Sequence, residues 1–312
     1  MESKKIIEVN SFFEQPWWLD AVAPDQWGEI IVKRGEDICA RLPYVQKKKY
    51  GLKAITMPPY TQTLGPWLRP SEARYAKQIS EQKDLMNELI AQLPVFDYFC
   101  QNFSPSITNW LPFFWAGFQQ TTMYTYRIND LSDHERIWHD FLDRTRRAIR
   151  KAEKNVVVRS DLGLDQLIQV NAMTFDRQGL QLPYHPDLIA NIDNACVAHN
   201  ARRMFFAEDT QGRIHAAIYI VWDSETARYL LGGGDPALRQ SGAHYLLIWE
   251  AIKFASTVSL SFDFEGSMIK PIEHFFRSFG AIQTPYYQIS KMNRRMKIAY
   301  HGKELMKAMF KC

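Results

Sequence analysis

Apolar residues along the first 130 positions change between helical spacing and short strand-like runs. Between positions 74 and 93 they recur every three or four residues, which predicts an amphipathic helix. A Pro-rich section from 57 to 68 cannot be helical, because proline lacks the N–H that a helix interior needs. The predicted helices cover 15–23 and 74–93, and the predicted strands cover 29–32, 38–45, 95–99 and 121–128.

The second part of the chain repeats this order of elements after a polar break at 129–132. Ser132-Asp133-His134-Glu135 forms a capping-box pattern, and apolar residues then follow at helical spacing as far as Ala152. Further helices are predicted at 164–178, 186–200, 243–255 and 270–279, and strands at 156–159, 201–208, 213–222, 228–231, 258–264 and 286–291. The sequence therefore predicts an α/β protein with two domains, residues 1–130 and 131–312, each a mixed sheet flanked by helices.

Composition restricts the class of protein more than its function. With 312 residues and 46% hydrophobic content, the chain is long enough for about two domains. Its net charge of +4 is too small to require nucleic acid, and no histidine or cysteine spacing indicates a metal site. The N-terminus has no signal-peptide core, and no apolar run approaches the ~20 residues of a membrane span. We therefore expect a cytoplasmic protein without a transmembrane segment.

The segment after residue 227 carries the first candidate chemistry. The predicted strand at 228–231 enters three glycines, and a polar loop then leads into the apolar helix at 243–255. Free N–H groups at such a helix start can bind phosphate or pyrophosphate, although an ordinary helix cap would show the same pattern. The candidates for binding a donor molecule are Gly232, Gly233, Arg239, Gly242 and Ala243.

Two carboxylates follow near the end of the next predicted strand. Asp263 and Glu265 are two residues apart, so a continued strand would place both on one face, opposite Phe262 and Phe264. Such a pair can act as a general base and as an anchor for an ammonium group, or it can serve only as a cap or salt-bridge partner. Tyr229 is a further catalytic candidate, because its hydroxyl could protonate a leaving group, although most strand tyrosines belong to the core.

A dense run of cations lies on the helix that precedes these segments. Six Arg and Lys residues fall between 144 and 154, on the face opposite the apolar stripe. A solvated surface and a binding surface for an acidic or phosphorylated partner both remain open. The candidates for binding an anion, expected to border the cleft between the domains, are Arg147, Arg150 and Lys151, with Lys270 at the start of a later helix as a fourth.

Three blocks of sequence resemble a known family. The segment from Thr145 to Lys154 resembles the R-x-x-I-R-K-A-x-K motif that opens the second domain of FemABX-type transferases. Residues 262–267 and 275–281 resemble the D-F-x-G-S and F-K-x-x-F-G-A block near the end of that family, and 117–126 looks like the strand that closes its first domain. Arg239-x-x-Gly242-x-His244 is similar to the Q/R-x-x-G-x-G/A signature of GNAT acyltransferases, with His244 in place of a small residue.

This resemblance implies a tandem GNAT-like fold and an N-acyltransferase. FemABX members use aminoacyl-tRNA to extend the peptide of a peptidoglycan precursor, and their GNAT-like relatives use acyl-CoA. The resemblance therefore implies one of these donors as co-substrate, no permanently bound cofactor, and a small amine or a cell-envelope precursor of the peptidoglycan type as acceptor. The alternative is a non-catalytic module that keeps the fold and binds an anionic ligand. The oligomeric state stays open.

Overall fold

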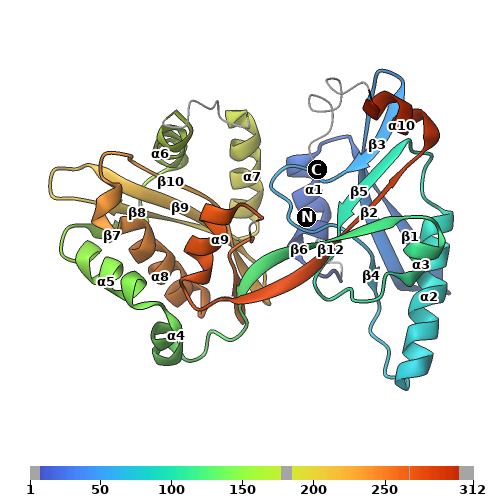
Figure 1. Ribbon diagram of the computed structural model, residues 1–312, viewed down its shortest axis with the longest axis horizontal. Helices are drawn as coiled ribbons and strands as arrows, with labels where there is room; N and C mark the ends of the chain where they lie inside the picture. Colours follow the sequence, from blue (N-terminus) through green and yellow to red (C-terminus); the bar gives the residue numbers. More distant parts are fainter. Residues whose placement is uncertain (1–7, 177–184, 267, 302–312) are drawn as a thin grey trace. The chain divides into compact units, whose positions relative to one another are not determined.

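A computed structural model describes residues 8–176, 185–266 and 268–301 (Figure 1). The chain divides into two compact units, Met1–Met123 together with Pro285–Cys312, and Tyr124–Thr284. Strands β6 (Gln119–Ile128) and β12 (Ile282–Met292) each continue from one unit into the other. Among the described residues, no helix combines the length and the apolar character needed to cross a membrane.

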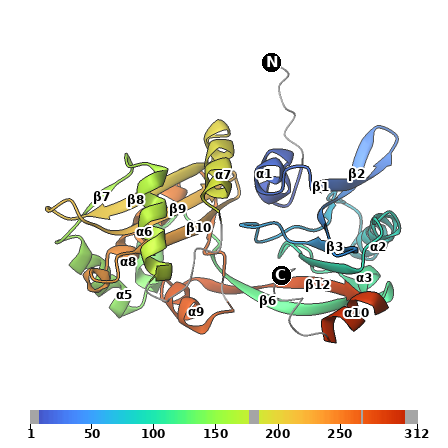
Figure 2. The same cartoon turned by 90° about the horizontal axis from the view of Figure 1, so that it is seen from above.

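The first unit contains a mixed sheet with helices beside it. Its sheet runs β1-β2-β3-β5-β12, with β3 and β5 parallel and the other neighbours antiparallel. Helix α2 lies beside β1 and β2 (Figure 2). Leu89 of this helix is fully buried in one cluster with Ile30, Val32 and Leu42. The elements are η1 (Phe12–Glu14), α1 (Pro16–Val22), β1 (Trp27–Arg34), β2 (Asp37–Lys49), β3 (Leu52–Thr56), β4 (Trp67–Leu68), α2 (Tyr75–Ala91), β5 (Tyr98–Asn102), α3 (Leu111–Trp115) and α10 (Arg294–His301).

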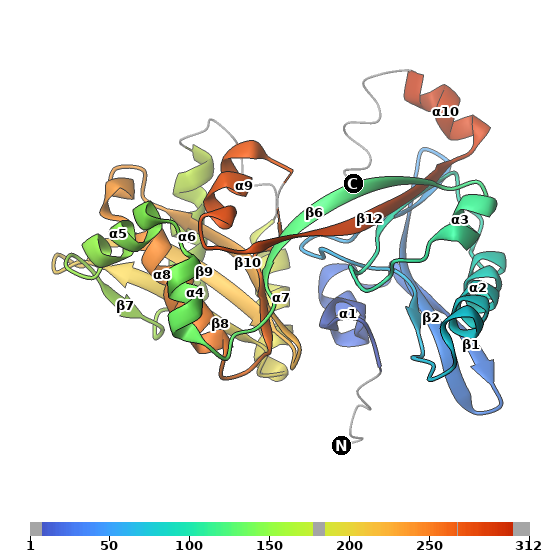
Figure 3. The same ribbon diagram turned by 60° about the horizontal axis from the view of Figure 1, so that its bottom comes forward.

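The second unit contains a mixed sheet between two layers of helices (Figure 3). Its strand order is β6-β11-β10-β9-β8-β7, in which only β10 and β11 are parallel. The elements are α4 (His134–Asp140), α5 (Asp143–Ala152), β7 (Val157–Arg159), α6 (Leu164–Asp176), α7 (Pro186–Ala198), β8 (Arg202–Glu208), β9 (Ile214–Trp222), β10 (Thr226–Gly234), η2 (Arg239–Ser241), α8 (Ala243–Ala255), β11 (Ser261–Asp263) and α9 (Lys270–Arg277).

Helix α8 forms the centre of the largest core. Most of its side chains are apolar, and eight of its thirteen residues are buried. Ile218 and Ile220 of β9 pack on this side of the sheet together with Leu247 of α8. On the opposite side, Tyr219 of β9 donates a hydrogen bond of 2.9 Å to Asp193 of α7. Alternate residues of β9 therefore serve two helical layers, which explains why the strand is buried along almost its whole length.

The predicted fold class is confirmed, and the element boundaries differ in informative places. The single helix expected from the capping-box pattern to Ala152 is two helices, α4 and α5, because Leu142 is extended and its N–H donates to Ser278 O at 3.0 Å. The cap of α4 is Asp133, whose side chain accepts from Arg136 N, instead of Ser132. The predicted helix at 164–178 is seen to Asp176, and its last two positions lie outside the described residues.

The two compact units differ from the predicted ranges 1–130 and 131–312 at two places. The second unit begins at Tyr124, and the first unit includes the chain from Pro285 onward. Residues 288–292 of β12 pair with β5 of the first unit, over a separation of about 190 residues in the sequence. A pattern of local elements contains no information about pairing over such a distance.

Candidate functional site

The site is built around the divergence of two parallel strands. Strands β10 and β11 pair only over 226–228 and 261–263. Strand β10 then continues to Gly234, with an irregularity in its pairing with β9 between Tyr229 and Leu231. Within the described residues, the stretch from Tyr229 to Gly234 therefore has β9 on one side and no paired strand on the other. An open strand edge of this kind presents backbone N–H and C=O groups that no neighbouring strand binds.

A pocket of about 240 Å³ lies at the far end of this open stretch. Four of the five predicted donor-binding residues line it, namely Gly232, Gly233, Arg239 and Ala243. The other lining residues are Thr174, His215, Ala216, Gly234, Pro236, Ser241 and His244. The structure thus brings together residues that the sequence distributes over a strand, a loop and a helix start.

Gly242, the fifth donor-binding candidate, has a packing role. It precedes α8 with φ of 82°, in the left-handed region that favours glycine. A Cβ atom at this position would lie 2.4 Å from the carbonyl oxygen of Ala148, so α5 packs directly against the start of α8. The N–H of Ala243 is capped by the hydroxyl of Ser241 at 3.2 Å. The start of α8 is therefore held in place. His244 is the second residue of this helix, so its position is also fixed.

Tyr229 and His244 contact each other beside the pocket. The Tyr229 hydroxyl lies 3.2 Å from Nε2 of His244, and the two rings are tilted with centroids 6.0 Å apart. Burial raises the pKa of the Tyr229 phenol and lowers the pKa of His244 to about 4. At neutral pH the imidazole is therefore uncharged and can donate or accept a hydrogen bond, depending on its tautomer.

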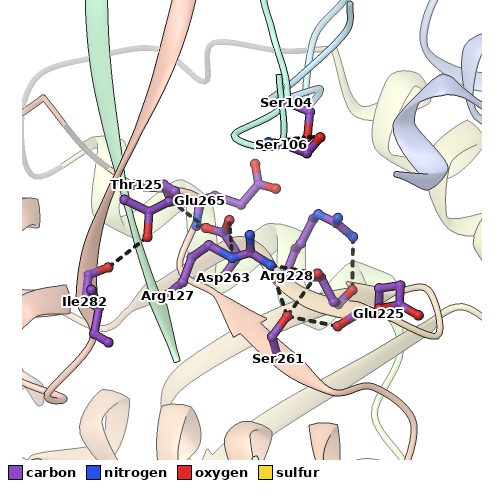
Figure 4. A network of polar contacts seen from close by, with 12 residues as sticks. Ser104, Ser106, Thr125, Arg127, Glu225, Arg228, Ser261, Asp263, Glu265 and Ile282 are labelled. Atoms are coloured by element: carbon purple, nitrogen blue, oxygen red, sulfur yellow. Dashed lines mark hydrogen bonds and ion pairs between the residues drawn. The ribbon is translucent and has the colours of Figure 1, made fainter. Parts of the chain in front are cut away.

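The side chain of Asp263 makes structural contacts. Its side chain is almost completely buried at the end of β11, where Oδ1 accepts from the hydroxyl of Thr125 and from the N–H of Glu265 (Figure 4). Its Oδ2 lies 3.6 Å from Nε of Arg127. Arg127 in turn donates to the hydroxyls of Thr226 and Ser261, both at 3.0 Å. This carboxylate therefore connects β6 with the end of β11, and its Oδ1 already accepts two hydrogen bonds.

Glu265 is in a different position from the one that alternation along a strand predicted. Strand β11 ends at Asp263, and Glu265 has φ of 59°, so the two carboxylates do not share a strand face. The left-handed backbone turns the side chain away from the contact between Thr125 and Asp263 (Figure 4). Its Oε1 is buried and has no hydrogen-bond partner among the described residues. A strained backbone and an unpaired buried carboxylate oxygen in one residue are features typical of functional sites.

The electrostatic environment of Glu265 favours the protonated form. Burial raises the pKa of this carboxyl well above its usual value, and the negative charge of Asp263 raises it further. The guanidinium of Arg228 offsets part of this rise. Arg228 is itself held by an ion pair with Asp223 at 3.0 Å. A carboxyl whose pKa moves toward neutrality is suited to exchanging protons with a substrate.

The four predicted anion-binding residues occupy separate positions. All are exposed, three on α5 and one at the start of α9. Lys151 donates to the carbonyl oxygen of Gln240 at 2.7 Å, and the Arg150 guanidinium lies 5.7 Å from the centre of the Trp138 ring. In the part of the chain that the structure describes, no hydrogen bond or ion pair holds Arg147 or Lys270.

Thr125, Arg127 and Arg228 belong to the site and were not selected in the sequence analysis. Thr125 and Asp263 are 138 residues apart, and their contact depends on the pairing of β6 with β11. The available signal was a buried arginine within the strand at 226–234, which requires a carboxylate partner. Among the described residues, no cluster of His, Cys, Asp and Glu could hold a metal ion.

Comparison with known protein families supports acyl transfer in general. The Acetyltransferase (GNAT) domain family matches residues 139–268, a range that includes β10, α8 and β11. No curated protein has a significant match to the sequence. The matched range lies within the second unit and agrees with the GNAT-like fold that the sequence motifs predicted.

Solved structures share the fold of most of the chain. FemX has a TM-score of 0.66 at 12% identity, over 92% of this chain and 94% of FemX. A tandem GNAT protein from the clavulanic acid biosynthesis pathway has a TM-score of 0.50 at 9% identity, over 86% and 84%. The C-terminal domain (DUF2156) of a putative lysylphosphatidylglycerol synthetase from Agrobacterium fabrum has a TM-score of 0.53 at 15% identity, over 88% and 87%. The chain has a FemX-like tandem GNAT fold, and at these identities the likeness concerns the fold alone.

Proposed function

We propose that this protein is an N-acyltransferase that moves an acyl or aminoacyl group from an activated donor to an amine, with Glu265 as the general base. The observation that carries this proposal is the buried Oε1 of Glu265, which has no hydrogen-bond partner among the described residues and lies just after β11, where β11 diverges from β10. The GNAT domain match over the same strands supports the reaction class. Asp263 is a positioning residue in this proposal, because its Oδ1 accepts from both the Thr125 hydroxyl and the N–H of Glu265, and its Oδ2 faces Arg127.

The reaction follows from these positions. The amine nitrogen attacks the donor carbonyl, and the Glu265 carboxylate takes the proton that the nitrogen loses, directly or through a water molecule. The raised pKa makes the ionised carboxylate a stronger base than an exposed glutamate. The guanidinium of Arg239, which lines the pocket, is suited to the negatively charged end of the donor.

The donor and the acceptor follow from the family resemblance and belong to the proposal. The donor is an acyl-CoA or an aminoacyl-tRNA, used as a co-substrate. The acceptor is a small amine or a peptidoglycan-type precursor reached from the cytoplasm. Exposed cations on α5, such as Arg147, are compatible with either donor, because both carry phosphates.

The direct test uses acetyl-CoA and an alanylated RNA minihelix as donors, with a panel of amines that includes a soluble peptidoglycan pentapeptide. Mass spectrometry of the products should show transfer from one donor by the wild-type protein. Glu265→Gln should lower kcat by about a hundredfold or more, as expected for loss of a general base. Glu273→Gln is the matched control, because Glu273 lies on neighbouring α9 and pairs with Arg277.

A second candidate function is a binding module that keeps the GNAT fold and holds an anionic ligand. The guanidinium of Arg147, exposed and without an ion pair to any residue that the structure describes, favours this alternative. If calorimetry detects binding of the RNA or of CoA while no donor is consumed by the wild-type protein, the binding module replaces the transferase.

A further inference from the structure

We propose that His244 is a positioning residue of the transfer site, which holds the Tyr229 hydroxyl in place as the proton donor to the leaving group. This inference rests on the proposed transferase function and concerns the opposite end of the reaction from Glu265. Three observations carry it: the direction of the His244 ring, the position of the Tyr229 hydroxyl, and the location of both beside the pocket.

The His244 ring is directed inward. A helix start that only caps a loop, or only faces solvent, would leave a polar side chain at its second residue exposed. Instead, the His244 ring is packed edge-on against Phe275 of α9, with centroids 5.4 Å apart, and its Nε2 contacts Tyr229 of β10. The same residue lines the pocket that contains the predicted donor-binding residues. His244 thus connects α8 and β10 at the pocket wall.

The Tyr229 hydroxyl occupies space that exists only because residue 232 is glycine. A Cβ atom on Gly232 would lie 2.3 Å from the Tyr229 oxygen. The Phe276 ring contacts the Tyr229 ring edge-on, with centroids 5.7 Å apart. The phenol is therefore fixed on three sides, by Gly232, Phe276 and His244, next to a glycine that lines the pocket. Fixed geometry of this kind increases the efficiency of a proton donor.

Each proton in the proposed reaction of Tyr229 and His244 has a donor and an acceptor. Attack by the amine forms the new C–N bond and breaks the bond between the acyl carbon and the leaving oxygen or sulfur. Tyr229 gives its hydroxyl proton to that leaving atom, and the resulting tyrosinate accepts a hydrogen bond from Nε2–H of neutral His244. The proton that Glu265 takes from the amine returns to Tyr229 through water, so the protein ends the cycle unchanged.

The role of His244 predicts a specific pattern of kinetic effects. With the donor that the wild-type protein uses, Tyr229→Phe should lower kcat by about a hundredfold, in the range of general acid catalysis. His244→Ala should lower kcat by about tenfold with KM within twofold, because the hydroxyl loses its partner but stays present. His244→Gln, whose amide N–H can reach the same place, should restore most of the lost rate. Tyr245→Phe and His139→Gln are the matched controls, since Tyr245 is the next residue of α8 and His139 is exposed on α4.

A donor with an acidic leaving group separates proton donation from general damage to the site. p-Nitrophenyl acetate releases an anion that needs no proton, so its consumption should fall less than threefold in Tyr229→Phe and His244→Ala. In ¹⁵N-edited spectra of the resting protein, the His244 ring nitrogens should shift in Tyr229→Phe and stay unchanged in Tyr245→Phe.

The outcomes are distinguishable. Transfer by the wild-type protein with an unchanged kcat in His244→Ala overturns the role of His244 and leaves the transferase intact. A raised KM at constant kcat also overturns it, because His244 would then only bind the donor. Equal losses with p-nitrophenyl acetate and with the natural type of donor overturn it as well. Absence of transfer by the wild-type protein from every donor overturns the transferase function, and the inference with it.

Discussion

The backbone N–H of Glu265 donates a hydrogen bond of 2.8 Å to Oδ1 of Asp263, so one carboxylate fixes the position of the other. The negative charge of Asp263 faces the guanidinium of Arg127, 3.6 Å from its Oδ2. Glu265, by contrast, has an oxygen without a partner among the described residues. The two acidic residues, which look equivalent in the sequence, therefore have separate tasks.

Substitution of each carboxylate should separate these tasks. Asp263→Asn should lower the free energy of unfolding by about 3 kcal/mol, because it removes the negatively charged partner that lies 3.6 Å from the guanidinium of Arg127 in a mostly buried part of the sheet. Glu265→Gln should leave the free energy of unfolding at pH 7 equal or higher, while transfer activity is lost. Urea unfolding followed by circular dichroism measures both. Equal destabilisation by the two substitutions would show that Glu265 is also a structural partner.

The pH dependence of stability should identify the raised pKa of Glu265. The folded-state pKa lies above that of the unfolded chain, so the protonated carboxyl stabilises the fold fully below the unfolded pKa of about 4.3. This contribution is lost as the pH rises through the folded pKa. Glu265→Gln keeps an uncharged side chain at every pH, so its advantage in melting temperature over the wild-type protein should grow from pH 4.5 upward and then become constant. A difference that is independent of pH would contradict the raised pKa.

The residues of the site were predictable from sequence to different degrees, for physical reasons. Gly232, Arg239 and Ala243 lie on consecutive elements, so a strand, a loop and a helix start were enough to predict that they come together. Glu265 and Asp263 were both selected from the sequence as candidate bases, but the difference between them was not predictable, because the strand pattern continued through 264 while the backbone turns into the left-handed region at 265. In the sequence, His244 only replaced a small residue of the GNAT-like pattern, because its contact with Tyr229 depends on the folded structure.

Prediction of the fold was limited in the same way, because local patterns do not reveal contacts between distant residues. Helix α8 was predicted with its observed bounds, because an apolar segment after a glycine is a local signal. The break between α4 and α5 was missed, since it depends on Ser278, far along the chain, accepting the N–H of Leu142. Helix α3 escaped prediction because its five residues are too few for a periodic pattern.

Two cations on α5 should behave differently when neutralised. Lys151 holds the carbonyl of Gln240 in the loop before α8, whereas Arg147 is exposed without a fixed partner in the described structure. Arg147→Gln should weaken CoA or RNA binding by up to about fivefold, the usual range for an exposed charge, and leave the melting temperature unchanged. Lys151→Gln should weaken binding and also loosen the loop, which is detectable as faster amide exchange at 239–242. Titration calorimetry at 0.05 M and 0.5 M salt measures the affinities, and an effect that persists at high salt would exclude simple charge attraction.

Gly266 should be the least replaceable glycine of the site. It has φ of 45°, and a Cβ atom there would lie 2.3 Å from Cα of Thr125, which is backbone and cannot move aside easily. Gly212, in the turn between β8 and β9, has φ of 76° with nothing within 4 Å of the same position. Gly212→Ala should therefore cost only the conformational term, about 1 kcal/mol, whereas Gly266→Ala should cost at least about 2 kcal/mol more through overpacking against β6. Denaturant unfolding of the two variants measures this difference directly.

Because Gly266 follows Glu265, Gly266→Ala should also reduce transfer under conditions where the variant is fully folded, and Gly212→Ala should not. Equal costs for the two substitutions would mean that β6 and the 265–266 turn are less closely packed than the structure shows.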